Sequence, residues 1–146
     1  GQGGLLRGLA LGFESLRAAG RTRTIPRLVG VQARPCAPLW ALYAHGAAGL
    51  SLTREGETAA EGIRIAHPLR GDAVLGAVER SGGAMLVVDE EAILPARDAL
   101  GRGGLYVEPT SAVVWAALPE ILPVFPDPVV LMLTGSGLKA APPRPA

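Results

Sequence analysis

The sequence is poor in the residues that stabilise secreted proteins or bind metals. Its 146 residues include one cysteine, Cys36, so no disulfide can form within the chain. A reduced, cytoplasmic setting is therefore the simplest expectation. The two histidines, His45 and His67, are far apart in the sequence, and with a single cysteine they do not make a metal-binding set. We predict no metal site.

Long apolar segments and one-sided charge are also missing. No apolar run reaches the roughly 20 residues that span a membrane, and residues 1–4 do not have the charged and apolar regions of a signal peptide. The formal net charge is +1, with the arginines spread along the chain, whereas nucleic-acid binding needs basic residues gathered on one face. We therefore expect a small molecule or a protein as partner, and neither a membrane nor a nucleic acid.

The composition and periodicity that are present indicate an α/β domain. Hydrophobic residues make up 49% of the chain, which is enough to bury a core in one domain. Short apolar runs at 28–31, 84–88 and 129–133 are typical of strands buried on both faces of a parallel sheet. Apolar residues at helical spacing begin at Leu6 and stop before Gly20. Further helices are expected at 37–44, 72–80 and 110–118. This alternation predicts a mostly parallel sheet with helices on both faces.

Three local features carry further predictions. Asp89 is a good N-cap for a helix that begins with Glu90, although Pro95 would remove a backbone hydrogen bond inside it and predicts a kink or a late start. Residues 46–58 are rich in glycine and polar residues, which favours a mobile loop. The tail 140–146 contains three prolines and is expected to be disordered.

Two glycine-rich turns could bind a ligand, and the first opens the chain. Gly1, Gln2, Gly3 and Gly4 run directly into a helix, and glycines let backbone N–H groups converge at a positively polarised helix terminus. The loop is not a Walker loop, because no Lys-Ser/Thr follows, nor a dinucleotide fingerprint, because no acidic residue closes a βαβ unit about 20 residues later. From this pattern alone, an ordinary turn without a ligand is the better interpretation.

The second turn, 134–137, begins with Thr134 and follows the apolar run at 129–133. Ligands of open parallel sheets bind beyond the carboxyl ends of the strands, so a hydroxyl held between glycines there can reach a bound group. A plain β-turn explains the same residues equally well.

Six strings occur in the order and spacing seen in threonine synthases: VQARPCAPL, TAAEGIRI, SGG, DEEAI, GLYVEPTSA and LTGSGLK. The resemblance covers residues 1–139. GIRI and the closing LTGSGLK are more similar to threonine synthases than to the related dehydratases and racemases, which share the general layout. The chain therefore resembles part of a fold type II pyridoxal 5′-phosphate enzyme of the tryptophan-synthase β family.

The resemblance implies a site for that cofactor. In the family, the glycine-rich loop holds the phosphate of pyridoxal phosphate, and this role falls on a run of five residues: Gly1, Gln2, Gly3, Gly4 and Leu5. Leu5 can contribute only its backbone N–H.

The resemblance assigns the other end of the cofactor as well. The hydroxyl that meets the pyridine nitrogen maps to Thr134. A hydroxyl, unlike a carboxylate, does not hold that nitrogen protonated, and so tempers the electron-withdrawing character of the ring. The turn with Glu61 and Gly62 resembles the segment that faces the reactive side of the cofactor.

A reaction is implied too: a homodimeric carbon–oxygen lyase converts O-phosphohomoserine and water to threonine and phosphate. The chemistry requires a lysine bound covalently to the cofactor. The only lysine here, Lys139, matches the lysine of the family's closing GLK, whereas the Schiff-base lysine belongs to a segment before Gly1. We therefore expect residues 1–139 to be the C-terminal part of a PLP-binding large domain, with no catalytic residue of its own and no activity alone.

Two alternatives stay open. One is a threonine or serine dehydratase, or another β-replacement enzyme of the same family. The other is a non-catalytic, phosphate-binding half-domain. In each case an incomplete large domain should expose apolar surface, which association between copies would cover.

Overall fold

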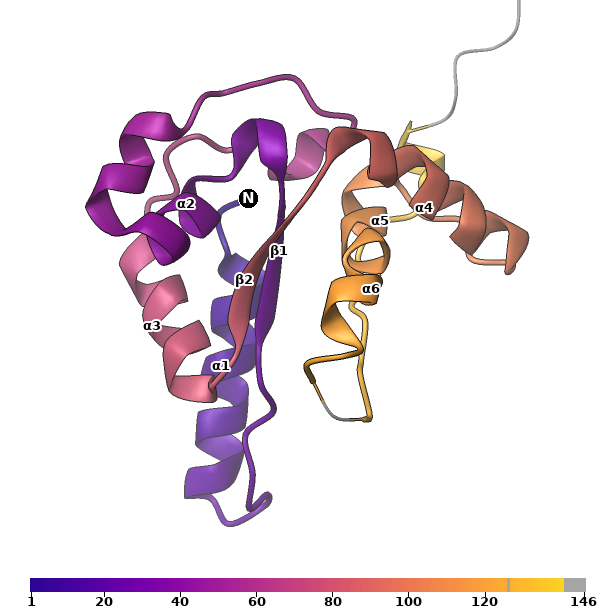
Figure 1. The fold of residues 1–146 in the computed structure, drawn as a ribbon. Helices are drawn as coiled ribbons and strands as arrows, with labels where there is room; N and C mark the ends of the chain where they lie inside the picture. The colour runs from indigo at the N-terminus through magenta and orange to yellow at the C-terminus, as the bar shows by residue number, and fades with distance from the viewer. Residues whose placement is uncertain (126, 141–146) are drawn as a thin grey trace, which may run out of the picture.

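The computed structural model describes residues 1–125 and 127–140. Its centre is a pair of parallel strands, β1 (Val29–Ala33) and β2 (Ala84–Val88), in register along their whole length. Helices α1, α2 and α3 cover one face of the pair, and α5 and α6 cover the other (Figure 1). The α/β fold with helices on both faces is therefore confirmed, and both strands arise from apolar runs that the sequence shows.

The first face is covered by α1 (Gly4–Ala18), α2 (Pro38–His45) and α3 (Gly71–Ser81). Close packing against β1 depends on Gly30, since a Cβ there would lie 2.6 Å from the Met85 sulfur and 3.1 Å from the Leu6 side chain. The helix α1 ends shortly before Gly20, whose φ of +67° favours glycine. The predicted helix and its glycine stop are both present.

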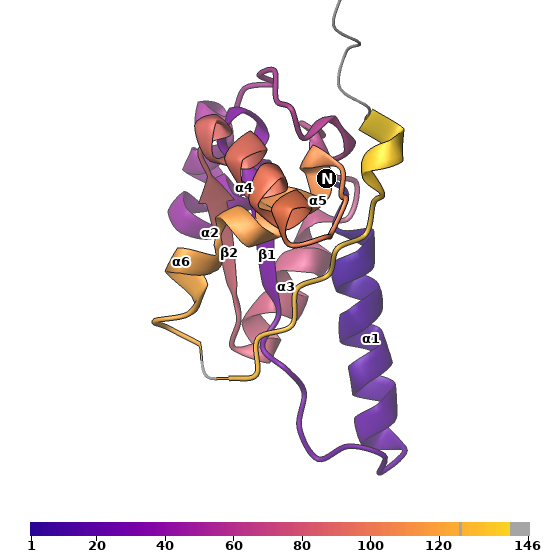
Figure 2. The same cartoon turned by 90° about the vertical axis from the view of Figure 1, so that its right-hand side faces the viewer.

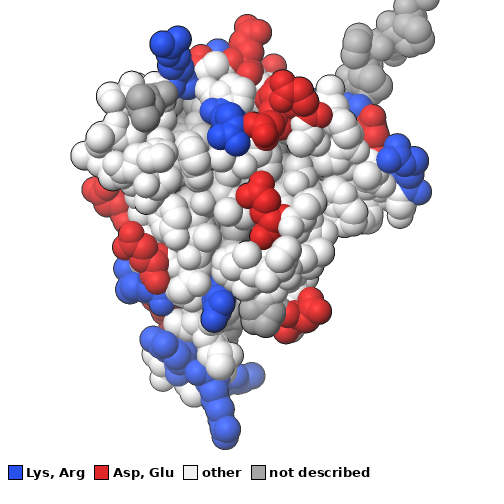
Figure 3. All heavy atoms as spheres, in the orientation of Figure 1, with Lys and Arg blue, Asp and Glu red and all other residues white. Residues whose placement is uncertain are grey.

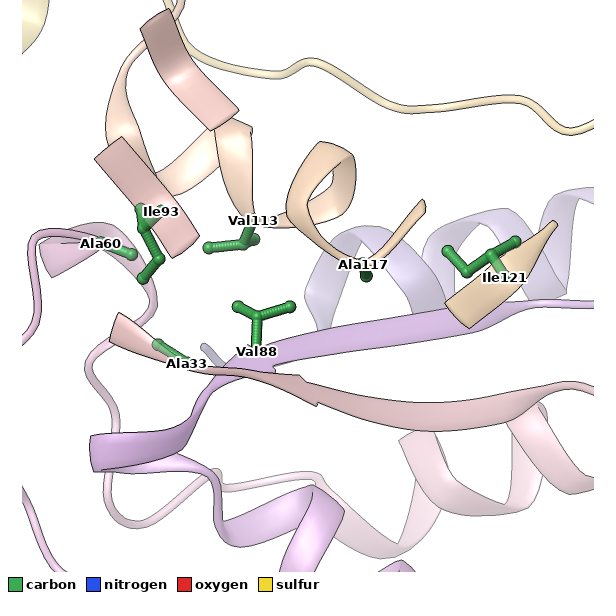
Figure 4. Close-up of a cluster of buried hydrophobic side chains, with 7 residues drawn as sticks. All are labelled: Ala33, Ala60, Val88, Ile93, Val113, Ala117 and Ile121. Atoms are coloured by element: carbon green, nitrogen blue, oxygen red, sulfur yellow. The ribbon is translucent and has the colours of Figure 1, made fainter. Parts of the chain in front are cut away.

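The second face is covered by α5 (Pro109–Ala116) and α6 (Leu118–Ile121), and α4 (Glu90–Arg102) packs against α5. Side chains from both strands, from the turn at residue 60 and from these helices form the buried cluster in Figure 4, made of Ala33, Ala60, Val88, Ile93, Val113, Ala117 and Ile121. Fully burying a side chain of the size of Ile93 contributes about 1.5–3 kcal/mol. The core on this face therefore fixes α4 and α5 against the sheet.

The prediction of a third strand at 129–133 is wrong. Among the described residues the sheet has two strands, and the segment makes no ladder. Its side chains Val130 and Met132 are 76% and 43% exposed. A strand needs a neighbouring backbone to satisfy its N–H and C=O groups, and no described strand lies beside this segment. An apolar run shows the preference for burial but not the presence of a partner.

The helix α4 begins at Glu90, as predicted, so the late start that Pro95 suggested does not occur. Asp89 occupies the N-cap position, but its side chain does not cap the helix. Its carboxylate pairs instead with the Arg34 guanidinium, at the point where β1 ends. The two strand ends are thus joined by an ion pair.

Within residues 1–125 and 127–140 there are also four 3₁₀ helices: η1 (Arg34–Cys36), η2 (Gly46–Leu52), η3 (Glu61–Ile63) and η4 (Gly137–Ala140). The predicted loop at 46–58 is therefore wrong for its first seven residues, which form η2. Gly49 permits this, because a Cβ there would overlap the Ala41 carbonyl group. The predicted disordered tail begins one residue too early, since Ala140 belongs to η4, and the rest of it, 141–146, lies outside the described residues.

Charged side chains are sparse over the middle of the face in Figure 3, and basic ones gather at its lower end, where α1 ends in Figure 1. The loop after α1 carries Arg21, Arg23 and Arg27, all exposed. The 15 residues of α1 separate this end from the N-terminal loop by about 22 Å. In the part of the chain that the structure describes, no helix is both long and apolar enough to cross a membrane.

Candidate functional site

The N-terminal glycine loop lies near the end of the sheet where β1 continues into η1 and β2 into α4 (Figures 1 and 2). Gly3 adopts a φ of +72°, and a Cβ on it would lie 2.5 and 2.9 Å from the two methyl groups of Val74. The Gln2 side chain accepts a hydrogen bond from the Leu69 N–H at 3.0 Å. Both contacts fix the loop against α3 and the segment that precedes it.

The loop presents unbonded backbone amides at the start of α1. The first helical hydrogen bond runs from the Arg7 N–H to the Gly3 carbonyl at 3.0 Å, so the amides of Gly4 and Leu5 have no partner within the helix. No side chain caps this end, and its first turn holds no acidic residue. The helix terminus therefore carries a positive partial charge that an anion can neutralise.

The ionisable side chain beside the loop contributes no positive charge of its own. Burial, together with the nearby Glu55 carboxylate, raises the pKa of the Cys36 thiol. The positive potential at the loop thus comes from backbone amides.

The turn at η3 connects the loop to α5. A Cβ on Gly1 would lie 3.4 Å from the Ile63 Cα and 3.6 Å from the Gly62 carbonyl oxygen. The Gly62 N–H donates to the Thr110 hydroxyl at 3.1 Å, and a Cβ on Gly62 would lie 2.9 Å from the same oxygen. Gly62 is therefore a position that only glycine fits without movement of Thr110. The neighbouring Glu61 is exposed.

Glu90, the first residue of α4, holds the same turn from the other side. Its Oε1 accepts a hydrogen bond from the Ala59 N–H at 2.6 Å, and Ala60 is fully buried. The second oxygen of Glu90, Oε2, is buried without a partner in the described residues. The backbone of 59–62 is thus held by side chains of α4 and α5.

Thr134 lies beside Ser111 of α5. Their hydroxyl oxygens are 3.4 Å apart, and the Ser111 oxygen accepts a hydrogen bond from the Gly135 N–H at 2.7 Å. Ser111 is 2% exposed, whereas Thr134 is exposed. Ser111 is therefore buried, whereas Thr134 lies at the surface.

The segment 134–137 is also fixed by the residues before α5. The Gly137 N–H donates to the Tyr106 carbonyl at 3.0 Å, and the Glu108 N–H donates to the Gly135 carbonyl at 3.1 Å. Between them Val107 and Ser136 form an isolated antiparallel bridge. Thr134 is thus held by backbone hydrogen bonds rather than by the strand that the sequence suggested.

The structure connects the residues that the sequence singled out. Gly1 contacts η3, Gly62 of η3 bonds to α5, and Ser111 of α5 bonds to the turn of Thr134. Sequence reasoning missed Thr110, Ser111 and Glu90, which make these connections. The hydroxyl-rich string EPTSA was visible, but its partners are 48 residues before and 24 residues after it, so spacing alone could not identify them.

The arrangement offers two different kinds of contact. Uncapped amides at α1 suit a phosphate, and the hydroxyl of the exposed residue Thr134 suits a ring nitrogen. These are the groups at the two ends of pyridoxal phosphate, so the residues present fit that cofactor. In the described residues, no cluster of three or more histidine, cysteine, aspartate or glutamate side chains could hold a metal ion.

Comparison with known proteins identifies the class. A profile described as pyridoxal-phosphate dependent enzyme matches residues 1–135. The chain therefore belongs to this family of fold type II enzymes, whose members depend on pyridoxal phosphate and act on small amino-acid substrates.

Individual relatives include two threonine synthases and a threonine deaminase. The threonine synthase of Methanosarcina acetivorans is 32% identical over 144 residues, and that of Methanocaldococcus jannaschii is 31% identical over 144 residues. Each comparison covers 95% of this chain and 36% of the relative. A crystal structure of a threonine deaminase from "T.th." matches with a TM-score of 0.67 and 27% identity, over 93% of this chain and 47% of that one. The chain thus spans little more than a third of the curated relatives' length.

Proposed function

We propose that the chain is the cofactor-holding part of a threonine synthase, a lyase that converts O-phosphohomoserine and water to threonine and phosphate. The observation that carries the proposal is the contact network in which the uncapped start of α1 and the Thr134 hydroxyl are joined through η3 and α5. The threonine synthases among the relatives, at 31–32% identity, support this choice of reaction.

In this proposal the loop binds the phosphate. The amides of Gly3, Gly4 and Leu5 donate to its oxygens, and Gly1 completes the loop. Gln2 acts indirectly, because its side chain is engaged with the Leu69 N–H at 3.0 Å and so holds the loop in place. The absence of an acidic residue from the first turn of α1 leaves the site open to a charged phosphate.

The remaining contacts orient the ring. Thr134 donates its hydroxyl proton to the pyridine nitrogen, and the turn with Glu61 and Gly62 borders the reactive side. Bound there, the cofactor would supply an electron-withdrawing ring that stabilises negative charge on the substrate carbon. The residues of this chain bind and orient the cofactor; they do not move the substrate's protons.

The proton-moving lysine would come from outside this sequence. Lys139 is the only lysine in the chain, and it is exposed on η4. We propose that residues 1–139 form the C-terminal part of a large domain that is inactive by itself. The complete enzyme would be a cytoplasmic homodimer.

A second candidate reaction is the deamination of threonine or serine. The similarity to a threonine deaminase structure, with a TM-score of 0.67, supports it. The two reactions share the cofactor and differ in what leaves the substrate: phosphate from the γ carbon in one, water from the β carbon in the other.

The test uses the polypeptide in the length at which its source cell makes it. O-phosphohomoserine, threonine and serine are supplied separately, and inorganic phosphate, ammonia and 2-oxo acids are measured. Phosphate release together with threonine formation, from the first substrate alone, is the expected result. Ammonia and a 2-oxo acid from threonine or serine, without phosphate release from O-phosphohomoserine, would instead establish the deaminase. Binding of the cofactor without turnover of any substrate would identify a non-catalytic module.

A further inference from the structure

The hydrogen bonds around Ser111 determine where its single hydroxyl proton goes. A serine hydroxyl donates one hydrogen bond and can accept others. The Ser111 oxygen already accepts from the Gly135 N–H at 2.7 Å. Within the described part of the chain, its other hydrogen-bond contact is the Thr134 hydroxyl oxygen at 3.4 Å. Because Ser111 is 2% exposed, water does not compete freely for its proton, which leaves the Thr134 oxygen as the available acceptor.

The direction of this bond determines what Thr134 can do. Once the Thr134 oxygen accepts from Ser111, its own proton is free to be donated away from the pair, toward the exposed side. We infer that Ser111 is a positioning residue that fixes the hydrogen-bond direction of Thr134, so that Thr134 acts as a donor toward the bound ligand. The ligand atom that faces it must then be an acceptor, such as a heteroaromatic nitrogen with a free lone pair. This inference rests on the proposed cofactor site.

No charged group near the pair takes the place of the hydrogen bond between Ser111 and Thr134. The Glu108 carboxylate lies against Gly135, but no hydrogen bond joins it to either hydroxyl in the described residues. Tyr106, Glu61 and Lys139 lie on neighbouring segments, and α4, which packs against α5, carries further titratable groups: Glu90, Glu91, Arg97, Asp98 and Arg102. In the described residues, none of these groups hydrogen-bonds to either hydroxyl. The direction of the Thr134 bond is therefore determined by neutral groups, the Gly135 amide and the Ser111 hydroxyl.

The test uses pyridoxine 5′-phosphate labelled with ¹⁵N in the ring. This probe carries the phosphate and the ring nitrogen but no aldehyde, so its binding needs no lysine. The ¹⁵N chemical shift reports whether the nitrogen is protonated, and it is followed across pH for the free probe and for the probe bound to the protein. We expect binding to lower the pKa of the ring nitrogen by about 1, the size of one hydrogen bond made only by the unprotonated form.

Variants distinguish the proposed positioning role of Ser111 from a purely structural role. Ser111→Ala should return the pKa of the bound ring nitrogen to within a few tenths of the free probe's, while the probe still binds through its phosphate. Thr134→Val should do the same, and Thr134→Ser, which keeps the hydroxyl, should retain the wild-type pKa. Because Thr134 is exposed, its variants should fold, so a wild-type pKa retained in Thr134→Val would refute the inference even if Ser111→Ala fails to fold.

Ser81→Ala is the matched control. The Ser81 hydroxyl also accepts a backbone N–H, from Leu28 at 3.0 Å, and donates to the Val78 carbonyl at 2.7 Å. It is a partly buried serine of the same kind, at the end of α3 on the first face of the sheet. Its loss should leave the ring-nitrogen pKa unchanged.

The outcomes distinguish this inference from the proposed function. A wild-type protein that does not bind the probe overturns both. Binding with a ring nitrogen that stays protonated as in the free probe, or with the wild-type pKa retained in Thr134→Val, overturns the role of Ser111 and leaves the cofactor site standing. A pKa that returns to the free value in Thr134→Val and in a folded Ser111→Ala, but not in Ser81→Ala, supports the inference.

Discussion

Replacing Gly3 by alanine should destabilise the protein more than the same change at another glycine of similar backbone conformation. Gly3 has a φ of +72°, and an added Cβ would lie 2.5 and 2.9 Å from the methyl carbons of Val74. Val74 is 1% exposed in the core between α1, α2 and α3, so it has little room to move. The substitution combines backbone strain with overlap between the loop and α3.

The magnitude follows from these two terms. A left-handed conformation costs an alanine about 1–2 kcal/mol, and overpacking in a dense core costs about 1–3 kcal/mol. Reduced entropy of the unfolded chain offsets about 0.4–1 kcal/mol. The net loss for Gly3→Ala is therefore about 2–3 kcal/mol. Gly20 has a φ of +67° with no atom within 4 Å of an added Cβ, so Gly20→Ala should lose only about 1 kcal/mol.

Urea unfolding of both variants measures the difference. Val74→Ala, made alone and together with Gly3→Ala, completes a double-mutant cycle. Because Val74→Ala removes the two methyl groups that an alanine at position 3 would overlap, Gly3→Ala should lower the free energy of unfolding by at least about 1 kcal/mol less in the Val74→Ala background than in the wild type. If Gly3→Ala costs no more than Gly20→Ala, or if the cycle shows no coupling, Gly3 does not pack against Val74 and the proposed arrangement of the phosphate loop is wrong.

Three further predictions concern other parts of the molecule. Because burial raises the pKa of the Cys36 thiol, ionisation of this thiol opposes folding. The stability of the protein should therefore be unaffected at pH values below the usual pKa of a thiol and should fall as the pH rises above it. Thermal unfolding of Cys36→Ala should show a smaller fall in stability over the same pH range. The leucines Leu5 and Leu16 of α1 are 50% and 46% exposed and should drive self-association. A variant with both Leu5→Gln and Leu16→Gln should therefore sediment as a smaller species than the wild type, and equal sedimentation of the two would contradict this. Gly62→Ala should weaken binding of pyridoxine 5′-phosphate through its overlap with Thr110, and calorimetry should show partial recovery when Thr110→Ala is added.

The elements that sequence could predict are those determined by local pattern. The run at 84–88 became β2 with the same bounds, and the periodicity from Leu6 became α1, because one apolar face packs on the sheet. The run at 129–133 has the same composition and forms no strand. Whether this segment forms a strand depends on the presence of a neighbouring backbone, which composition does not encode. The glycine-rich start of the 46–58 segment likewise formed η2, since Gly49 fits closely against α2.

The residues of the candidate site likewise include some that the sequence could predict and some that it could not. The glycine loop and Thr134 were identified from short motifs and from a family resemblance, both of which are read along the chain. Thr110 and Ser111 were not, because their partners Gly62 and Gly135 come from distant segments. Hydrogen bonds between segments far apart in sequence leave no periodic signal, so only the folded structure shows that these adjacent hydroxyls connect the turn at η3 with the turn of Thr134.

The most direct test of the central claim is a titration of ¹⁵N-labelled protein with pyridoxine 5′-phosphate, followed through the backbone amide signals. We expect saturable shifts of the amides of Gly3, Gly4 and Leu5 and of the Gly135 amide near Thr134. Pyridoxine without its phosphate should bind much more weakly and leave the signals of the loop amides unchanged. Shifts confined to other regions, or equal binding of both compounds, would contradict the assignment of the α1 terminus and Thr134 to one cofactor site.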